Sequence, residues 1–374
     1  MRYIKSYNNT TDLRTDLDAG KLDHPYVAKI NDTIDFDSIG TNWKKEYFTI
    51  IALTDGTISY SHKEGSNPMF YSINEGEWIE TTVSVDITVS TNDMIRFKSN
   101  RGNQAYNQET FTSGGTAQFE VAGNLMSLVA GDDFATYVPN TSATGTDGEL
   151  YRSFENFFRY CTGLISAKNL IIKYCDNESF ISFFDGCTHL SIPPKLPAMT
   201  LANNCYGFMF AGCTSLITAP ELPATTLASS CYADMFYGCT SLTTAPALPA
   251  TTLASFCYSS MFMGCTSLTT APALPSTTLE IMCYKSMFEG CTSLTTAPAL
   301  PATTLIFLCY GNMFHNCAKI NYIKCLATDI SARNCTSNWV SGVASTGTFV
   351  KSPDMNDWTE GASGIPTGWT VIDA

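Results

Sequence analysis

The four histidines are the first residues to test for chemistry, because imidazole serves both as a general base and as a metal ligand. They are His24, His62, His189 and His315, and none stands at metal-site spacing from another histidine or a cysteine. The sequence also lacks the GxSxG, HExxH, P-loop and GxGxxG motifs. We therefore predict that the chain is not an enzyme, that it has no catalytic residue and that it binds no cofactor.

Carboxylates and thiols offer other kinds of metal site. Asp132 with Asp133, and Asp35 with Asp37, carry oxygen atoms suited to calcium, although carboxylates in loops are more often simply solvated. A zinc array built from the cysteines would need four ligands that converge. Most cysteines alternate at spacings of eight and eighteen residues, which suits core positions on separate faces. We predict no metal site.

The cysteines form two ladders with a step of 26 residues. All fifteen lie at or beyond Cys161, and thirteen belong to the ladders. One ladder is Cys161, Cys187, Cys213, Cys239, Cys265, Cys291 and Cys317, and the other is Cys205, Cys231, Cys257, Cys283, Cys309 and Cys335. A cysteine at a fixed place in a repeat behaves as a small buried apolar residue. Seven in a row cannot all pair, so we expect reduced thiols, as in a protein assembled in a reducing cytosol.

The same step recurs in other residue types and defines seven repeat units between about 151 and 335. The clearest unit, 242–265, reads LTTAPALPATTLASFCYSSMFMGC. Methionine recurs at Met209, Met235, Met261, Met287 and Met313, and tyrosine at Tyr206, Tyr232, Tyr258, Tyr284 and Tyr310. We interpret the methionines as core residues. The tyrosines either pack between coils, which we favour, or form a half-exposed aromatic edge that binds glycan or protein.

Each unit predicts one strand and one short helix. Residues 241–244 are short, β-branched and alternating, which suits a parallel stack, and the prolines at 246 and 249 end that strand. Leu253, Cys257 and Met261 then follow at i, i+4 and i+8, the spacing of one helical face. Thr251 or Thr252 would cap this helix at its start, and Gly264 would end it.

These units resemble the BspA-like family of leucine-rich repeats, whose signature is close to F-x-G-C-T-S-L. GCTSL begins at Gly212, Gly238, Gly264 and Gly290, and GCTHL begins at Gly186. The first and last units depart from it as YCTGL (160–164) and NCAKI (316–320), as expected of capping units. The resemblance covers about half of the chain. It implies an α/β leucine-rich-repeat solenoid of 26-residue coils at 151–335, used for adhesion or protein interaction without catalysis.

An all-β domain is predicted before the solenoid. Between 45 and 128 the candidate strands are 47–53, 57–62, 69–74, 85–90, 94–99 and 117–121, which suggests a β-sandwich-like domain. Residues 129–150 read as a linker. Residues 336–374 contain Trp339, Trp358 and Trp369, and we interpret them as a C-terminal cap whose tryptophans close the last coil, with a loosely ordered tail as the alternative.

The N-terminal residues 1–44 are polar, mixed in charge and too short for a core. They lack the apolar stretch of a secretory signal, unless the signal has been trimmed from the sequence. Their pattern MRYIKSYNNTTDL…AGKLDHPYVAKI resembles leader segments of structural proteins in phages of gut bacteria, including crAss-like phages. The resemblance implies a virion protein that docks through 1–44 on other virion proteins, assembled in the host cytoplasm. The alternative is a bacterial cell-surface adhesin.

Charge and hydropathy exclude several partners. The net charge is −13, with 21 basic against 34 acidic residues and no basic cluster, which argues against nucleic acid and anionic membrane surfaces. No apolar stretch approaches the roughly 20 residues that span a bilayer, so we predict no membrane insertion. The expected partners are virion proteins, a host surface protein or glycan, and further copies of the chain, because structural assemblies are commonly symmetric homo-oligomers.

One position in the repeats changes character along the chain. After the repeated leucine, the small residues at 228–230 are followed by Ala-Ser-Phe at 254–256. Ile281 and Met282 stand there in the next unit, and Ile306, Phe307 and Leu308 in the one after. Exposed apolar patches commonly mark partner contacts. These five residues are therefore the candidate interface, with either another subunit or the C-terminal cap as its partner.

Overall fold

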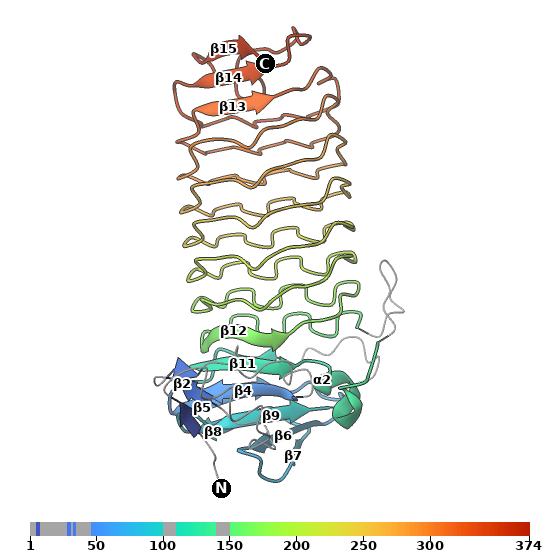
Figure 1. The fold of residues 1–374 in the computed structure, drawn as a ribbon, viewed down its shortest axis with the longest axis vertical. Helices are drawn as coiled ribbons and strands as arrows, with labels where there is room; N and C mark the ends of the chain where they lie inside the picture. The colour runs from blue at the N-terminus through green and yellow to red at the C-terminus, as the bar shows by residue number, and fades with distance from the viewer. Residues whose placement is uncertain (1–4, 8–27, 31–32, 35–45, 100–109, 140–149) are drawn as a thin grey trace.

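The computed structural model describes residues 5–7, 28–30, 33–34, 46–99, 110–139 and 150–374. The molecule is elongated, with β-sheets at one end and a long stack of coils that carries the C-terminus at the other (Figure 1). It is rich in β-structure, and the helices of the described part are α2 (Ser127–Ala130) and the 3-10 turn η2 (Gly131–Asp133). Neither is long enough to cross a membrane. His24, Asp35, Asp37 and most of the predicted N-terminal segment lie outside the described residues.

Short strands are present within residues 1–44. They are β1 (Lys5–Tyr7), β2 (Ala28–Ile30) and β3 (Thr33–Ile34), and they form a small sheet in the order β1-β2-β3. β1 and β2 are parallel, whereas β2 and β3 are antiparallel.

Two sheets form the region between 46 and 128, and all six predicted strands are confirmed there. The larger sheet has the order β12-β11-β4-β9-β6-β7, and the smaller has the order β10-β5-β8. Their bounds are β4 (Phe48–Ala52), β5 (Gly56–Ser61), β6 (Met69–Ile73), β7 (Ile79–Thr81), β8 (Val85–Val89), β9 (Met94–Lys98), β10 (Thr110–Phe111), β11 (Phe119–Asn124) and β12 (Leu164–Ile171). The short strands β7 and β10 were not predicted.

The two sheets and the first coil share one apolar core. Phe48 and Phe97 of the larger sheet contact Phe111 of the smaller sheet, with ring centroids 5.9 and 5.2 Å apart. Phe111 also stacks on Phe158 of the first coil at 5.4 Å. Strand β12 of that coil pairs in parallel with β11. The larger sheet therefore runs directly into the stack.

The segment predicted as a linker, 129–150, begins inside this core. Val129 and Phe134 are buried together with Leu128 of α2. The first residues of the segment therefore pack on the sheets rather than extend between domains, while 140–149 lie outside the described residues.

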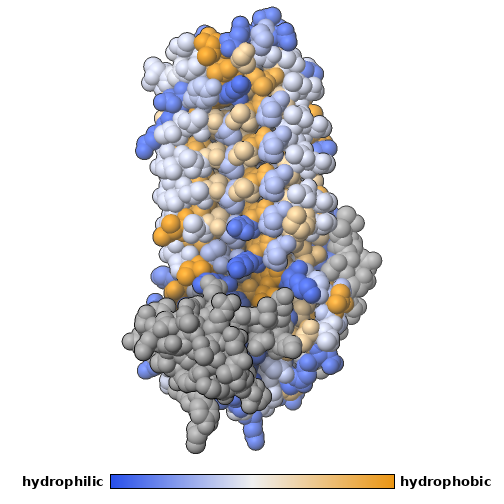
Figure 2. Space-filling view, viewed as in Figure 1, coloured by the Kyte–Doolittle hydropathy of each residue, from blue (hydrophilic) through white to orange (hydrophobic). Residues whose placement is uncertain are grey.

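We call residues 150–342 the coil stack. Its coils repeat every 26 residues, and parallel bridges join Thr218 to Thr244 and Thr244 to Thr270. The strand predicted at 241–244 is thus reduced to a single bridge residue in the middle coils, since proline follows two residues later and donates no hydrogen bond. Figure 2 shows hydrophobic and hydrophilic residues aligned in columns along one face of the stack.

The helix predicted in each coil is wrong, because residues 255–264 form consecutive turns. The N–H of Met261 donates within its coil to the carbonyl of Tyr258 (3.3 Å), whereas the N–H of Phe262 donates to Met287 of the next coil (2.9 Å). Every fourth residue is left-handed, with φ of 61° at Phe256, 53° at Ser260 and 76° at Gly264. A helix would need uniformly negative φ and bonds within the segment alone. Gly264 is left-handed as expected, but it ends no helix.

Stacked rings fill the interior of the coils. Phe236 and Phe262 lie 5.6 Å apart with planes 6° from parallel, and Tyr232 and Tyr258 lie 5.9 Å apart, also at 6°. All five tyrosines of the row are at most 2% exposed, so packing between coils is confirmed and the exposed aromatic edge is wrong. The methionines of the neighbouring row are fully buried, as predicted.

The last coil is covered by aromatic residues of the C-terminal region. Trp339 stacks on Tyr310 at 6.2 Å, and Trp358 stacks on Trp339 at 5.6 Å. The indole N–H of Trp369 donates to the carbonyl of Ala344 (2.7 Å). A parallel sheet of β13 (Tyr322–Cys325), β14 (Thr348–Lys351) and β15 (Thr370–Asp373) completes this end.

Candidate interaction surface

The left-handed positions of the turns provide the first clue to a functional surface. One such position recurs every 26 residues, with φ between 50° and 61°. Along the stack it is occupied by Arg152, Glu178, Asn204, Ser230, Phe256, Met282, Leu308 and Asn334. Asparagine tolerates left-handed φ, whereas a large apolar side chain costs on the order of 1 kcal/mol there. Three successive coils thus hold strained apolar residues where neighbouring coils hold polar ones.

Backbone hydrogen bonds place these residues beside other apolar side chains. The N–H of Phe256 donates to the carbonyl of Ile281 (2.9 Å), and that of Met282 donates to the carbonyl of Phe307 (3.2 Å). Phe256 is 36% exposed and Ile281 is 44% exposed. We call Phe256, Ile281, Met282, Phe307 and Leu308 the apolar ridge. It crosses three coils on the outside of the stack.

The ridge differs from the predicted interface by two residues. Ile281, Met282, Phe307 and Leu308 are partly or largely exposed and lie together. Ile306 instead packs against the core, and its N–H points to the Sγ of Cys309 (3.4 Å). Phe256 was not part of the predicted interface. It lies 26 residues before Met282 in the same column, and it shows the same replacement of a small residue by an apolar one.

The turn next to the ridge contains a half-buried carboxylate. Asp234 occupies the second left-handed position of its coil, with φ of 55°. Burial raises the pKa of Asp234 to about 6, while a hydrogen bond to Ser260 and the charge of Lys285 act in the opposite direction. The carboxyl group therefore changes charge close to neutral pH.

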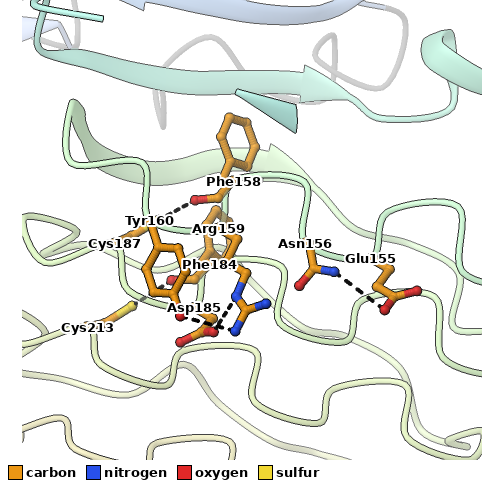
Figure 3. A network of polar contacts seen from close by, with 9 residues as sticks. All are labelled: Glu155, Asn156, Phe158, Arg159, Tyr160, Phe184, Asp185, Cys187 and Cys213. Carbon is orange, nitrogen blue, oxygen red and sulfur yellow. Dashed lines mark hydrogen bonds and ion pairs between the residues drawn. The ribbon is translucent and has the colours of Figure 1, made fainter. Parts of the chain in front are cut away.

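The thiols of the first cysteine ladder act as hydrogen-bond donors (Figure 3). Cys187 donates to the carbonyl of Phe158 (2.9 Å), and Cys213 donates to that of Phe184 (3.2 Å). Four later cysteines repeat the bond at 2.9–3.1 Å, namely Cys239, Cys265, Cys291 and Cys317. Burial raises the pKa of the Cys239 thiol to about 12. All fifteen cysteines are free thiols, and in this ladder they serve the structure.

Polar groups at the start of the stack are paired with one another. Arg159 contacts Asp185 of the next coil (2.8 Å) and also donates to the hydroxyl of Tyr160 (3.1 Å; Figure 3). Asp132, considered above as a calcium ligand, is bound instead by the ammonium of Lys98 (2.9 Å). Over the described ranges, no cluster of three or more potential metal-ligating side chains occurs.

The histidines within the described residues lie at separate places. His189 is exposed, and its Nδ1 lies 2.9 Å from the carbonyl of Thr162. His315 is half-buried beside Glu289, at 3.1 Å. His62 lies near the hydroxyl of Tyr60 (3.4 Å) in the sheet region. The ridge therefore remains the surface feature with the clearest departure from the repeat pattern.

Comparison with family models, with curated proteins and with solved structures gives no match to this chain.

Proposed function

We propose that the chain is a non-enzymatic interaction protein and that its coil stack is a leucine-rich-repeat solenoid of the BspA-like type. In this proposal it is a phage virion structural protein, a decoration or fibre of the head or tail. Residues 1–44 dock on other virion proteins, and the stack projects and binds. The alternative is a bacterial cell-surface adhesin that uses the same stack to bind a host protein or glycan.

The observation that carries the proposal is the strain along the apolar ridge. Phe256, Met282 and Leu308 occupy left-handed positions at which asparagine or serine occurs in other coils. Strained residues persist where function favours them over a more stable choice. Backbone hydrogen bonds place Phe256 beside exposed Ile281 and Met282 beside Phe307, so the column adds to one apolar surface. A surface of this kind fits a protein partner better than a polar glycan.

The test replaces Phe256, Met282 and Leu308 together by asparagine. Asparagine fits the left-handed backbone, so we expect thermal unfolding within a few degrees of the parent chain. Incorporation into particles, or binding to cells in the alternative, should fall at least tenfold. Ser230→Asn, in the same column outside the ridge, is the matched control and should bind like the parent chain. Unchanged binding by the triple variant would exclude the ridge as the contact surface.

A second experiment separates the two settings. Mass spectrometry of purified particles and of cell envelopes from the source culture would look for the peptide beginning at Met1 or Arg2. Recovery in particles with that intact N-terminus supports the virion proposal. Recovery on cells, with a leader cleaved upstream, would favour the adhesin.

A further inference from the structure

Strand β15 is the last strand of the C-terminal sheet, and within the described residues its outer edge pairs with no other strand. It pairs with β14 on one side, and all four of its residues are exposed, including Val371 at 42% and Ile372 at 48%. At the opposite end of the stack, β12 pairs with β11. An unpaired strand edge is a template for another strand, and natural proteins commonly blunt it with charge, proline or a bulge. The central residues of β15 are both apolar.

Two edge strands of the sheet region, β7 and β8, are less suited to a partner strand. β7 has three residues and exposes Glu80, and the exposed positions of β8 include Asp86 and Thr88 while Ile87 and Val89 are buried. Compared with β7 and β8, β15 is the edge better suited to a partner strand, because its two central residues are apolar and exposed. We propose that two copies of this chain pair end to end through antiparallel β15 strands. This inference goes beyond the proposed function and does not depend on the ridge.

The direction of the backbone groups restricts how such a pair can form. Thr370 and Ala374 donate their N–H groups to Gly347 and Lys351, at 2.9 Å each. Because groups alternate along a strand, Val371 and Asp373 point theirs toward the open edge. In an antiparallel pair, outward-pointing residues must lie opposite each other. The two-fold axis that relates the two copies must then pass between two copies of the same residue, which can be Val371, Ile372 or Asp373.

Two of these three registers are disfavoured. An axis at Val371 would set Asp373 opposite Trp369, which is buried. The backbone N–H of Trp369 already donates to the carbonyl of Pro366 (3.2 Å). An axis at Asp373 would set two carboxylates face to face, which destabilises a strand pair. The axis at Ile372 remains.

The Ile372 register uses every outward group of the strand. Val371 of each copy lies opposite Asp373 of the other, and the two pairs exchange four backbone hydrogen bonds. The two Ile372 side chains meet on the axis as a close apolar pair. In this register Asp373, which pairs with Lys351 of its own chain (2.7 Å), faces Val371 rather than the other Asp373. Because the other end of the stack is closed, this two-fold pairing yields a closed dimer and no filament.

Cysteine cross-linking of the full chain tests the register. In a non-hydrogen-bonded antiparallel pair the Cα atoms lie about 4.5 Å apart, within the range that a disulfide spans. Ile372→Cys should therefore form a covalent dimer under mild oxidation with oxidised glutathione. Val371→Cys is the matched control. In this register residue 371 faces residue 373 of the other copy, so the two new cysteines do not meet. This variant should stay monomeric in the same denaturing gel.

Sedimentation velocity tests the pairing without a cross-link. The parent chain should show a concentration-dependent monomer–dimer equilibrium. Val371→Pro removes an outward N–H while leaving the bonds to β14, so it should weaken the dimer about tenfold or more. Ile217→Pro and Ile217→Lys, at an exposed residue of a middle coil, should dimerise like the parent, whereas Ile372→Lys should not. A monomer at every concentration, a dimer that survives Val371→Pro and Ile372→Lys, or growing chains would each overturn the proposal.

Discussion

The inner and the left-handed residues of the turns behave differently along the coil stack. In the turns at 255–264, Met261 and Phe262 lie in the core and are fully buried, and the same two residue types recur in the neighbouring coils. The left-handed positions of the same turns carry different residue types from coil to coil, such as Asn204, Asp234 and Phe256. Packing between coils fixes the first set. The second set shares a backbone conformation but no residue type, and it carries charge in one coil and apolar surface in another.

This contrast separates stability from binding within one short segment. Each inner ring contacts its counterparts in the coils before and after, so a change there disturbs three coils. A left-handed residue is joined to its neighbours by backbone bonds that do not depend on its side chain. Substitutions should therefore produce a graded series of effects, from the core outward.

The largest expected difference concerns thiol reactivity. Fourteen of the fifteen cysteines are buried and Cys175 is partly exposed. Burial also raises the pKa of Cys161 to about 12, so its thiolate is scarce at neutral pH. A thiol reagent such as DTNB should label about one site in the native chain, with the others slower by roughly a thousandfold or more. Rapid labelling of several sites would contradict the buried ladders, and denatured protein gives the full count.

A core substitution should cost the most stability. Phe262→Ala removes a ring stacked between Phe236 and Phe288, at 5.6 and 5.7 Å, and should lower the free energy of unfolding by about 3–5 kcal/mol. Ser260→Ala, at the left-handed position two residues earlier, removes the hydrogen bond to Asp234 and should cost about 1 kcal/mol. Urea unfolding followed by circular dichroism measures both. Equal losses would remove the distinction between inner and outer residues.

The charge at Asp234 should produce a smaller, pH-dependent effect. Its folded pKa of about 6 lies above the ordinary 3.8, so the folded chain binds more protons between these values. The free energy of unfolding should therefore fall as the pH rises from about 4 to 6, by on the order of 1 kcal/mol after allowance for solvent screening. Asp234→Asn should abolish this fall and be more stable at pH 7. A parent and variant with parallel pH profiles would contradict the assignment.

The smallest effects should come from single changes at the left-handed column. Ser230→Asn should stabilise the chain by a few tenths of a kcal/mol, because asparagine tolerates the left-handed region better. Met282→Asn should change stability by less than about 0.5 kcal/mol, since relief of strain offsets the lost apolar contact. Differential scanning calorimetry of the two variants is the measurement. A loss of several degrees for Met282→Asn would make the ridge part of the core.

The sequence predicted the features that depend on local pattern. The strands at 85–89 and 94–98 follow from alternation of apolar and polar residues, and the buried columns follow from the 26-residue period. The helix was predicted in error because inward residues four apart suit a helix and a four-residue turn equally. Asn334, Asn338 and Gly342, spaced by four at left-handed positions, carried the distinguishing signal.

The candidate surface was predicted in part. Its apolar drift was visible in the sequence, but the inward turn of Ile306 depends on how residues 305–309 re-enter the core. The open edge at β15 had no local signal, because the exposure of a strand edge depends on what lies beside it in space.

The alternating hydrogen bonds of the turns also have a mechanical consequence. Along each turn, every second N–H donates to the next coil, so pulling the chain away from one end of the stack breaks the bonds of the outermost coil first. A coil of 26 residues occupies about 4.8 Å in the stack and roughly 90 Å when fully extended. When the C-terminal end is pulled, the stack should unfold one coil at a time, at a nearly constant force and in steps of uniform length.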